Sequence, residues 1–458
     1  MNSIPCPLQS NAQIFPNHPA IIDQNKSLTY QEFHQRVCAM TDYLAKRGIK
    51  PNDRVDIVSQ NSAEYLIMLL ALWRIKAVAC LLSTRLPQKN LKKQIKKLRC
   101  QYVLTLRHPE GAIATEGSLK KSFTYSLNQP TTIIFTSGTS GEPKAAVHTF
   151  GNHYFSAKGS NEHIPFKKGD RWLLSLPLYH VGGLSILFRA LLGGGTVVIA
   201  DPSQKLETNI HRYKITHVSV VPTQLYRLLQ KKPNAKVLKK LKAILVGGSS
   251  IPELLLTQSK RLRLPIYISY GLTEMSSQVA TSEKLKFNRV KILNYREFRI
   301  SKEGEILVKG KTLFKGYIKG KTIELALDHQ GWFHTGDLGR LTKGKYLSVI
   351  GRKDNMFISG GENIQPEEIE KYLLQIPGIE QAIVVPVKSK EFGFRPVAFI
   401  KRTKASFLTN AQIIQHLKNH LPKFKIPDQF LPWPNPLNKK NLKLNRKILS
   451  KAHHRKAS

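Results

Sequence analysis

One nine-residue segment has the residue types of a phosphate-binding loop. Thr136-Ser137-Gly138-Thr139-Ser140-Gly141-Glu142-Pro143-Lys144 follows directly after the apolar residues TIIF at 132–135. Hydroxyl groups, small residues and a lysine at the end of a strand form a concavity of hydrogen-bond donors that suits phosphate oxygens. The spacing is not that of a Walker A loop, and the same composition is common in plain turns. The segment by itself therefore predicts either a phosphate site or a turn.

Four further segments follow the order of motifs found in one enzyme superfamily. They are Tyr270-Gly271-Leu272-Thr273-Glu274, Trp332-Phe333-His334-Thr335-Gly336-Asp337, Gly351-Arg352-Lys353-Asp354 and Gly360-Gly361-Glu362. With the loop at 136–144, they resemble the signature segments of adenylate-forming enzymes, which include acyl-CoA synthetases, peptide-synthetase adenylation domains and luciferases. Five such segments in series, spread over most of the chain, imply membership of that superfamily.

The resemblance implies chemistry in which ATP activates a carboxylate. Such an enzyme holds the carboxylate in line with the α-phosphate, so that pyrophosphate leaves and an acyl-adenylate forms. It implies ATP, Mg²⁺ and CoA as cofactors, with Glu274 as a catalytic residue and Mg²⁺ ligand, since an oxygen donor suits this hard cation. Tyr270 is expected to lie against the adenine, and Asp337, assisted by Arg352, to accept hydrogen bonds from the ribose. The residues implied for cofactor binding are Thr136, Ser137, Gly138, Thr139, Ser140, Lys144, Gly248, Tyr270, Thr273, Asp337, Arg352, Gly360 and Gly361.

A second catalytic residue, a lysine, is implied near the C-terminus. The superfamily carries it in a Gly-Lys-x-x-Arg segment, and Lys443-x-x-Arg446 fits that pattern with Leu442 in place of the glycine. Lys443 is expected to neutralise charge between the carboxylate and the α-phosphate. Its domain is then expected to rotate about a hinge near Asp354 and bring Gly360-Gly361 to the thioester side. The sequence alone does not exclude three neighbouring lysines from this catalytic role: Lys439, Lys440 and Lys447.

Several stretches narrow the expected substrate. Residues 144–149, 174–182, 221–227 and 270–278 closely resemble the o-succinylbenzoate–CoA ligases of bacterial menaquinone biosynthesis, a branch of the superfamily. That resemblance implies a small-molecule substrate with two carboxylates, of which one is activated. The other needs a cation and hydroxyl donors in the acyl pocket. The candidates for substrate binding are His180, Arg227, Ser277 and Gln278. Arg227 is equally well a solvated helix residue, and His180 either gates the pocket or lines it.

The composition is that of a folded chain with a large positive charge. Of 458 residues, 41% are hydrophobic and 22% are charged, which excludes a disordered or fibrous chain. Lys and Arg number 72 against 30 Asp and Glu, a net charge of +42, so a nucleic-acid-binding protein is an alternative from another class. The basic segments 91–99 and 451–458 favour that alternative, but no zinc-finger, RNP-type or helix-turn-helix signature accompanies them. Another aryl or acyl acid ligase, or an enzyme that loads a carrier protein, is an alternative within the superfamily.

Short β-branched runs alternate with helical segments through the first part of the chain. Residues 28–48 show helical spacing and end at Gly48. The runs expected to form strands are 55–59, 131–137, 196–200, 216–222, 243–248 and 266–271. The apolar run 65–82 is interrupted by Arg74 and Lys76, so a buried helix followed by a strand is expected there, and no transmembrane segment. Alternating strands and helices predict parallel βαβ units in layers.

From about Phe298 the sequence pattern changes from alternating strands and helices to short strands separated by glycine turns. The last hundred or so residues predict helix (366–376), strand (382–387), strand (396–402) and helix (411–421). The expected fold class is therefore α/β. A large N-terminal layered α/β domain with a β-rich subdomain is expected over residues 1–351, and a small mobile α+β domain over 352–458.

The cysteines and the N-terminal residues indicate in which cellular compartment the protein is expected. The four cysteines lie at positions 6, 38, 80 and 100 without CxxC spacing, which argues against a disulfide framework or a zinc site. A reducing compartment is expected for such a chain. The N-terminal residues have neither a basic start nor an apolar stretch of the kind found in secretory signals. A cytoplasmic location is expected.

Overall fold

The computed structural model describes residues 2–24, 26–100, 102–104, 122–136, 143–230, 234–249, 251–343, 345–359, 362–389, 391–403, 408–434, 446, 449 and 450. Backbone contacts group the chain into two compact units. The first comprises Met1–Ser249, Ser259–Phe298 and Val308–Phe333, and the second comprises Ser250–Gln258, Arg299–Leu307 and His334–Ser458. The expected α/β class with a larger and a smaller part is confirmed. The domain boundary between residues 351 and 352 stays a prediction.

The larger sheet of the first unit has nine strands in the order β16-β15-β14-β13-β12-β10-β11-β2-β3. These strands are β2 (Pro19–Asp23), β3 (Lys26–Thr29), β10 (Arg171–Leu174), β11 (Thr196–Ile199), β12 (His217–Val220), β13 (Ala243–Val246), β14 (Ile266–Leu272), β15 (Ser277–Glu283) and β16 (Lys286–Ile292). From β2 to β14 along this order neighbours are parallel, as the alternating pattern predicts. The strands β3, β15 and β16 add antiparallel edges.

The second sheet of this unit has seven strands in the order β20-β19-β9-β8-β5-β4-β6. These are β4 (Arg54–Val58), β5 (Val78–Leu82), β6 (Tyr102–Leu104), β8 (Pro130–Thr136), β9 (Lys144–Thr149), β19 (Gly316–Lys319) and β20 (Thr322–Glu324). The strands β6, β4, β5 and β8 are parallel, whereas β9 and β19 join by antiparallel pairing. A small antiparallel pair, β1 (Ser3–Pro5) and β7 (Thr124–Ser126), completes the strands of this part.

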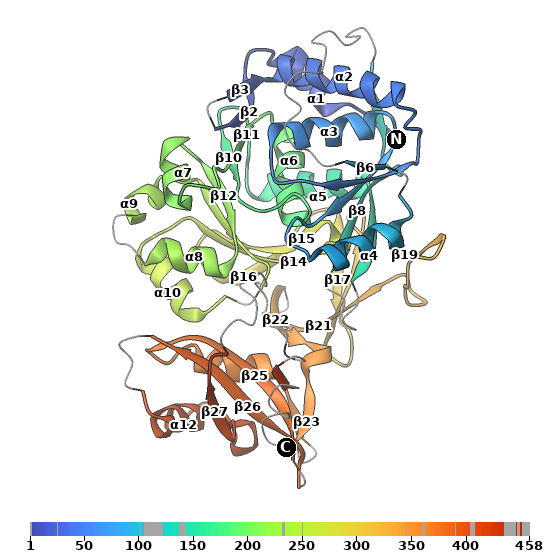
Figure 1. Ribbon diagram of the computed structural model, residues 1–458. Coiled ribbons are helices and arrows are strands. Elements are labelled where there is room, and N and C mark those ends of the chain that lie inside the picture. Colours follow the sequence, from blue (N-terminus) through green and yellow to red (C-terminus); the bar gives the residue numbers. More distant parts are fainter. Residues whose placement is uncertain are drawn as a thin grey trace. The chain divides into compact units, whose positions relative to one another are not determined.

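The helices before residue 262 connect these strands (Figure 1). They are α1 (Pro7–Ile14), α2 (Tyr30–Lys46), α3 (Ala63–Arg74), α4 (Gln88–Leu98), α5 (Phe150–His163), α6 (Val181–Gly193), α7 (Leu206–Arg212), α8 (Pro222–Leu229), α9 (Asn234–Lys239) and α10 (Glu253–Arg261). The helix expected over 28–48 is α2. Thr29 caps it reciprocally with Glu32, and Gly48 adopts a positive φ of 81° just beyond its end.

The apolar run 65–82 forms part of the core, as expected. It contributes most of α3 and all of β5, and nearly every side chain in it is buried. The interrupting cation Arg74 is itself buried and donates to Nδ1 of His34 at 2.7 Å. No helix in the described part of the chain combines the length and apolarity that crossing a membrane would require.

In the part of the chain that the structure describes, the second unit contains short sheets and two helices of its own (orange to red in Figure 1), together with most of α10, which falls within residues 250–258. A four-stranded sheet of order β17-β18-β21-β22 contributes β22 and most of β21 to it. The strands are β17 (Arg296–Ile300), β18 (Glu305–Gly310), β21 (Phe333–Thr342), β22 (Tyr346–Arg352), β23 (Phe357–Ser359), β24 (Glu362–Ile364), β25 (Ile379–Ser389), β26 (Gly393–Arg402) and β27 (Gln429–Pro432). The helices α11 (Pro366–Leu373) and α12 (Asn410–Lys418) pack with β25 and β26 around a separate apolar core. The expected helix–strand–strand–helix order of this part is confirmed.

Candidate functional site

The predicted phosphate loop is the connection of a β-hairpin. Strands β8 and β9 are antiparallel, and Thr136 and Lys144 are directly opposite each other in the ladder. The two ends of the loop are therefore held at one point, with Thr136 half-buried and Lys144 exposed. Four predicted phosphate ligands, Ser137, Gly138, Thr139 and Ser140, lie outside the described residues.

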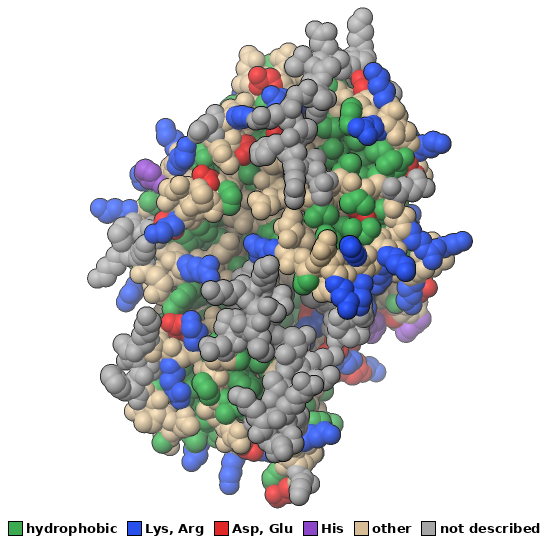
Figure 2. Space-filling model, in the orientation of Figure 1, with side chains coloured by type: hydrophobic (Ala, Val, Ile, Leu, Met, Phe, Trp, Pro, Cys, Tyr) green, Lys and Arg blue, Asp and Glu red, His purple; other side chains and the backbone are tan. Residues whose placement is uncertain are grey.

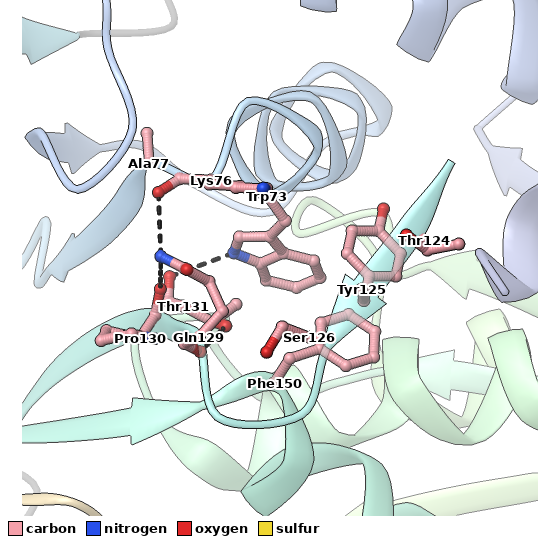
Figure 3. Close-up of a pocket in the computed structure, with 10 residues that line it drawn as sticks. All are labelled: Trp73, Lys76, Ala77, Thr124, Tyr125, Ser126, Gln129, Pro130, Thr131 and Phe150. Atoms are coloured by element: carbon pink, nitrogen blue, oxygen red, sulfur yellow. Dashed lines mark hydrogen bonds between the residues drawn. The ribbon is translucent and has the colours of Figure 1, made fainter. Parts of the chain in front are cut away.

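The beginning of β8 is anchored firmly to α3. The indole nitrogen of Trp73 donates to the carbonyl of Thr131 at 3.1 Å, and the side chain of Gln129 donates to the carbonyl of Lys76 at 3.1 Å (Figure 3). The cavity that these residues line is only about 10 Å³, room for about one water molecule. This region serves to fix the strand that leads to the loop and is too small for a substrate.

Glu274 lies close to the same hairpin. It belongs to a 3₁₀ turn, η1 (Thr273–Met275), between β14 and β15. The hydroxyl of Tyr317, on β19, donates to Oε1 of Glu274 at 2.5 Å. Nζ of Lys144 lies 5.2 Å from the centroid of the Tyr317 ring. Tyr317 thus links the end of the phosphate loop to the predicted Mg²⁺ ligand, a role that sequence reasoning missed because the tyrosine stands in none of the matched segments.

Three hydrogen bonds hold the turn that carries Glu274. Nε2 of His148 donates to the carbonyl of Thr273 at 2.7 Å, the backbone N–H of Phe314 donates to the carbonyl of Glu274 at 2.7 Å, and Oγ of Ser156 donates to the carbonyl of Ser276 at 2.8 Å. Burial lowers the pKa of His148 to about 4, although the bond to Thr273 acts to raise it. The ring is therefore neutral near pH 7 and carries its proton on Nε2, because a carbonyl only accepts.

The β14–β15 hairpin is tight and strained after this turn. Ser276 and Ser277 have φ values of 54° and 113°, in a region that L side chains seldom adopt. A Cβ on Gly271 would lie 2.1 Å from the carbonyl oxygen of Ser277, so only glycine allows the two strands to approach so closely. The strain and the close approach fix where Ser277 stands at the start of β15.

Two predicted nucleotide-binding residues end neighbouring parallel strands. Val246 and Ile268 are register partners on β13 and β14, and Gly248 and Tyr270 each lie two residues further along. The carboxyl ends of parallel strands are the usual place for a ligand in α/β sheets. Gly248 has a φ of 89°, and Tyr270 is half-buried.

Gln278 lies in a buried polar cluster of the first unit. Its side-chain oxygen accepts from Nη2 of Arg189 at 2.6 Å, and its amide nitrogen donates to Thr281 at 2.7 Å. Its backbone carbonyl accepts from Nε of Arg296 at 2.6 Å. Arg189 and Arg296 are 1% and 5% exposed, so two guanidinium groups are buried around one glutamine.

The two arginines differ in how their donors are used. Arg296 also donates to the carbonyls of Asn294, at 2.7 Å, and Ser156, at 3.1 Å. Nε and Nη1 of Arg189 have no hydrogen-bond partner within the described residues, and its guanidinium lies over the ring of Trp172, 4.7 Å from the centroid. Burial and then repulsion from Arg296 lower the pKa of Arg189 to about 9, so it stays positive near pH 7. No acidic side chain in the described part of the chain pairs with it.

Sequence reasoning missed Arg189, although a signal was present. It is the single charged residue of the apolar helical segment 181–193, which forms α6. The chosen cation, Arg227, is exposed on α8. His180 is exposed at the start of α6 with its ring 4.8 Å from that of Tyr179. The same helix thus begins at one predicted substrate residue and carries the buried cation.

The second unit brings Asp337 and Arg352 together. They are register partners on β21 and β22, and Nη1 of Arg352 donates to Oδ1 of Asp337 at 2.9 Å. Gly336 has a φ of 71°, and a Cβ there would lie 2.7 Å from Nη2 of Arg352. Although burial acts to lower it, the charges of Asp337 and Asp354 raise the pKa of Arg352. The pair predicted to hold the ribose is therefore an ion pair at a strand end.

One buried carboxylate, Glu305, supports this pair from both sides. It accepts from the backbone N–H of Gly336 at 2.9 Å and from Nζ of Lys353 at 3.2 Å, next to Asp337 and Arg352 respectively. Nδ1 of His334 lies 3.2 Å from Oε2 of Glu305, the same oxygen that accepts from Lys353. Burial acts to raise the pKa of Glu305, but these partners lower it below its usual value.

The residues that flank the predicted catalytic lysine are anchored in the second unit. Arg446 donates to both oxygens of Glu370 at 2.6 Å, and Leu449 is buried in an apolar cluster with Val385 and Phe399. Lys443 itself lies outside the described residues, as do Gly360 and Gly361. The arginine and the leucine of the Lys-x-x-Arg-x-x-Leu pattern, Arg446 and Leu449, thus have structural roles in the second unit.

The basic segment 91–99 forms most of α4 and the residue after it. Its polar face is rich in lysine, and Figure 2 shows blue side chains gathered where Figure 1 draws this helix. Nζ of Lys97 donates to the carbonyl of Pro143 at 2.8 Å, directly before Lys144. Part of the positive charge is therefore located beside the predicted phosphate loop.

Comparison with family models gives two matches along the chain. A model described as AMP-binding enzyme matches residues 8–318, and one described as AMP-binding enzyme C-terminal domain matches residues 368–440.

Comparison with individual proteins gives relatives of nearly the same length. A 2-succinylbenzoate–CoA ligase from Oceanobacillus iheyensis is 33% identical over 455 residues, covering 92% of this chain and 94% of the relative. One from Salmonella typhimurium is 36% identical over 448 residues, covering 95% of each. The solved o-succinylbenzoate CoA synthetase of Bacillus subtilis in complex with its acyl-adenylate intermediate is 30% identical, with a TM-score of 0.86 over 98% of both chains. The same synthetase in complex with ATP and magnesium ion gives a TM-score of 0.87 at 29% identity, covering 98% of this chain and 99% of that one.

Proposed function

This chain belongs to the AMP-binding enzyme family and, within it, to the 2-succinylbenzoate–CoA ligases, and from that premise we propose the reaction that its site performs. A carboxylate oxygen of 2-succinylbenzoate, the compound also called o-succinylbenzoate, attacks the α-phosphorus of ATP, and pyrophosphate leaves. The thiol of CoA then attacks the acyl carbon of the adenylate, and AMP leaves. The products are 2-succinylbenzoyl-CoA, AMP and pyrophosphate, which makes the protein an AMP-forming acid–thiol ligase.

The residues around Glu274 fit the adenylation step. The hairpin that holds Thr136 opposite Lys144 presents the loop to the phosphates of ATP, and Tyr317 orients one oxygen of Glu274. Tyr317 is the sole donor to the Glu274 carboxylate in the described part of the chain, so the other oxygen suits a hard cation. Mg²⁺ bound there would neutralise charge on the phosphates. Lys144 would add a second positive charge to the departing pyrophosphate.

The buried charge of Arg189 is the observation that carries the substrate assignment. A buried cation with two unused donor nitrogens and no acidic partner in the described residues is costly unless a ligand supplies the anion. A fatty acid has a single carboxylate, which the adenylation reaction consumes. 2-Succinylbenzoate has a second carboxylate on its ring, and we assign that group to Arg189.

The other substrate residues take supporting roles in this proposal. Gln278 holds one nitrogen of Arg189 and so orients the guanidinium toward the acyl pocket. Ser277, at the strained start of β15, is proposed to donate its hydroxyl to the substrate. His180 is proposed to line the entrance at the start of α6. Arg227, exposed on α8, remains a candidate for a peripheral contact only.

The thioester step rests on the C-terminal part of the chain. We retain Lys443 as the lysine that acts during adenylation, with residues 352–458 rotating against residues 1–351 about a hinge near Asp354 afterwards. Gly360 and Gly361 would then line the path of the CoA thiol. The support for Lys443 is its spacing to Arg446 and Leu449, which are both anchored in the second unit.

A cytoplasmic location is part of the proposal. All four cysteines are free thiols, which suits a reducing compartment.

Release of AMP with a panel of acids tests the function. The wild-type protein with ATP, Mg²⁺ and CoA should release one AMP per thioester with 2-succinylbenzoate. It should turn over poorly with 4-oxo-4-phenylbutanoate, which lacks only the ring carboxylate. A preference for long-chain fatty acids would overturn the substrate, and thioester formation on a carrier protein but not on CoA would overturn the acceptor.

A further inference from the structure

Two thiols and a carboxylate converge in the first unit at a place that the ligase reaction does not use. Asp56 on β4 and Cys80 on β5 are register partners on adjacent parallel strands, so their side chains point to the same face of the sheet. Cys100 follows α4, whose apolar side chains cover that face. The Sγ atoms of Cys80 and Cys100 lie 3.5 Å apart, and one ligand atom from each of the three residues lies within 4.8 Å of the others.

The carboxylate of this cluster lacks the partners that a buried charge needs. Asp56 is fully buried, and its carboxylate has no cation and no well-formed hydrogen bond among the described residues; its one polar neighbour there is the thiol of Cys100. Arg54, the cation on the same strand face two residues earlier, instead donates to the carbonyl of Leu98 at 3.0 Å. A buried, unpaired carboxylate costs several kcal/mol of folding free energy unless a proton or a cation compensates it.

We propose that Asp56, Cys80 and Cys100 bind a thiophilic divalent metal ion, for which Zn²⁺ is the best-suited candidate. Two sulfurs at about 2.3 Å from a tetrahedral Zn²⁺ lie roughly 3.8 Å from each other, close to the 3.5 Å observed here. Sulfur ligands disfavour Mg²⁺ and Ca²⁺, so this site is chemically distinct from that of Glu274. Cys100 is half-buried, so this side of the cluster is partly exposed to solvent, from which a water molecule would serve as fourth ligand.

The bound site would carry one net negative charge. Binding releases two protons from the thiols, and the two thiolates and the carboxylate, three negative charges, then surround the double positive charge of the ion. The ion would join the C-terminal end of α4 to the neighbouring strands β4 and β5, next to β8, which leads into the phosphate loop.

Motif spacing gives no indication of this site. Zinc sites recognised from sequence place two cysteines a few residues apart, whereas Cys80 and Cys100 are twenty positions apart and Asp56 is on another strand. The register of β4 against β5 brings the ligands together, and register is not visible in the spacing of cysteines.

Cobalt binding to the full-length, reduced, metal-free protein tests the proposal. We expect one Co²⁺ per chain with a thiolate-to-cobalt charge-transfer band, and displacement of the cobalt by Zn²⁺. Cys100→Ser and Asp56→Asn should each weaken Co²⁺ binding by at least about tenfold, because even loss of a residue that only supports a metal ligand costs that much. Cys38→Ser, which changes another buried thiol, should leave the band unchanged.

Two results would overturn the proposal. One is the absence of a charge-transfer band in reduced wild-type protein whose four thiols all titrate. The other is equal cobalt affinity of the wild type and Cys100→Ser. Cys100 lies outside the strands, so its serine variant should fold even if a Cys80 variant does not. Zn²⁺ should then raise the thermal midpoint of the wild type and not that of Cys100→Ser.

Discussion

Two regions of the molecule differ in whether acidic side chains compensate the positive charge of their arginines. Around Gln278 the buried Arg189 and Arg296 stand together, and no acid in the described residues pairs with Arg189. In the second unit Arg352 is half-exposed and pairs with Asp337 and Asp354. This difference fits the proposed roles: a site for an anionic substrate group would keep a positive charge uncompensated, whereas a site for neutral ribose hydroxyls would neutralise its charges internally. On that proposal, Arg189 is the arginine reserved for a ligand.

The largest expected effect comes from removing that reserved charge. Arg189→Met should lower kcat/KM for 2-succinylbenzoate by on the order of 10²–10³, since losing one member of a buried charge pair costs about 3–4 kcal/mol. The free energy of unfolding should change little, because removal of an uncompensated buried cation offsets the loss of the hydrogen bond to Oε1 of Gln278. Steady-state kinetics and urea unfolding measure the two quantities.

A substrate control sharpens this test. With 4-oxo-4-phenylbutanoate, which has no ring carboxylate, wild type and Arg189→Met should differ little. If the variant lost activity equally on both acids, Arg189 would act on the fold of the pocket and not on the second carboxylate.

The neighbouring arginine should show the reverse pattern. Arg296→Met removes the donor to the carbonyls of Gln278, Asn294 and Ser156 and leaves the buried acceptors of Gln278 and Ser156 unpaired. We expect a loss of about 3 kcal/mol in the free energy of unfolding. The KM for 2-succinylbenzoate in the protein that remains folded should change far less than in Arg189→Met. A fully stable Arg296→Met variant with a large KM increase would reverse the roles assigned to the two arginines.

The sequence predicted the strands and the order of motifs better than it predicted their convergence. The loop at 136–144 follows an apolar strand, and the apolar run 65–82 forms a buried helix and strand, because local periodicity and composition determine such elements. The antiparallel edge β14–β15–β16 was not predicted, since nothing in its periodicity distinguishes it from the parallel strands before it. Tyr317 was missed for a related reason, because only the pairing of β19 with β9 brings it to Glu274.

The sequence contains two different signals for a cation in the acyl pocket. Arg227 was chosen because it stands in a matched stretch, and the structure places it on an exposed helix face. Arg189 stands alone in an apolar helix, and a lone charge in such a segment is buried with the rest of it. Burial is what makes a charge costly, so the proposal for Arg189 rests on its position within the apolar pattern, whereas the prediction for Arg227 rests on membership of a motif.

Acid should lower the free energy of unfolding, because the buried His148 of the first unit is neutral in the folded protein. The folded-state pKa of His148 is about 4 against an ordinary value of 6.5, so the unfolded chain takes up the proton first as pH falls. Stability from this group is constant above about pH 6.5, falls as pH decreases toward 4, and changes no further below that. Its loss at pH 5 is about 2 kcal/mol. His148→Gln, whose amide can still donate to Thr273, should show a shallower fall in unfolding free energy between pH 7 and pH 5, while the exposed His329→Gln should match the wild type.

The smallest expected effect concerns the carboxylate that supports the ion pair of the second unit. Glu305→Gln keeps an acceptor for the Gly336 N–H but loses the charge that holds Lys353, so Asp337 and Arg352 should be less well ordered. We expect the KM for ATP to rise about fivefold, equivalent to about 1 kcal/mol, with little change in kcat. Glu303→Gln, two residues earlier and exposed, is the matched control and should leave both constants unchanged. A fall in kcat at constant KM would instead mean that Glu305 acts in the chemical step. Glu305 would then not simply neutralise charge around Asp337 and Arg352, and the proposed contrast with the uncompensated Arg189 would not hold.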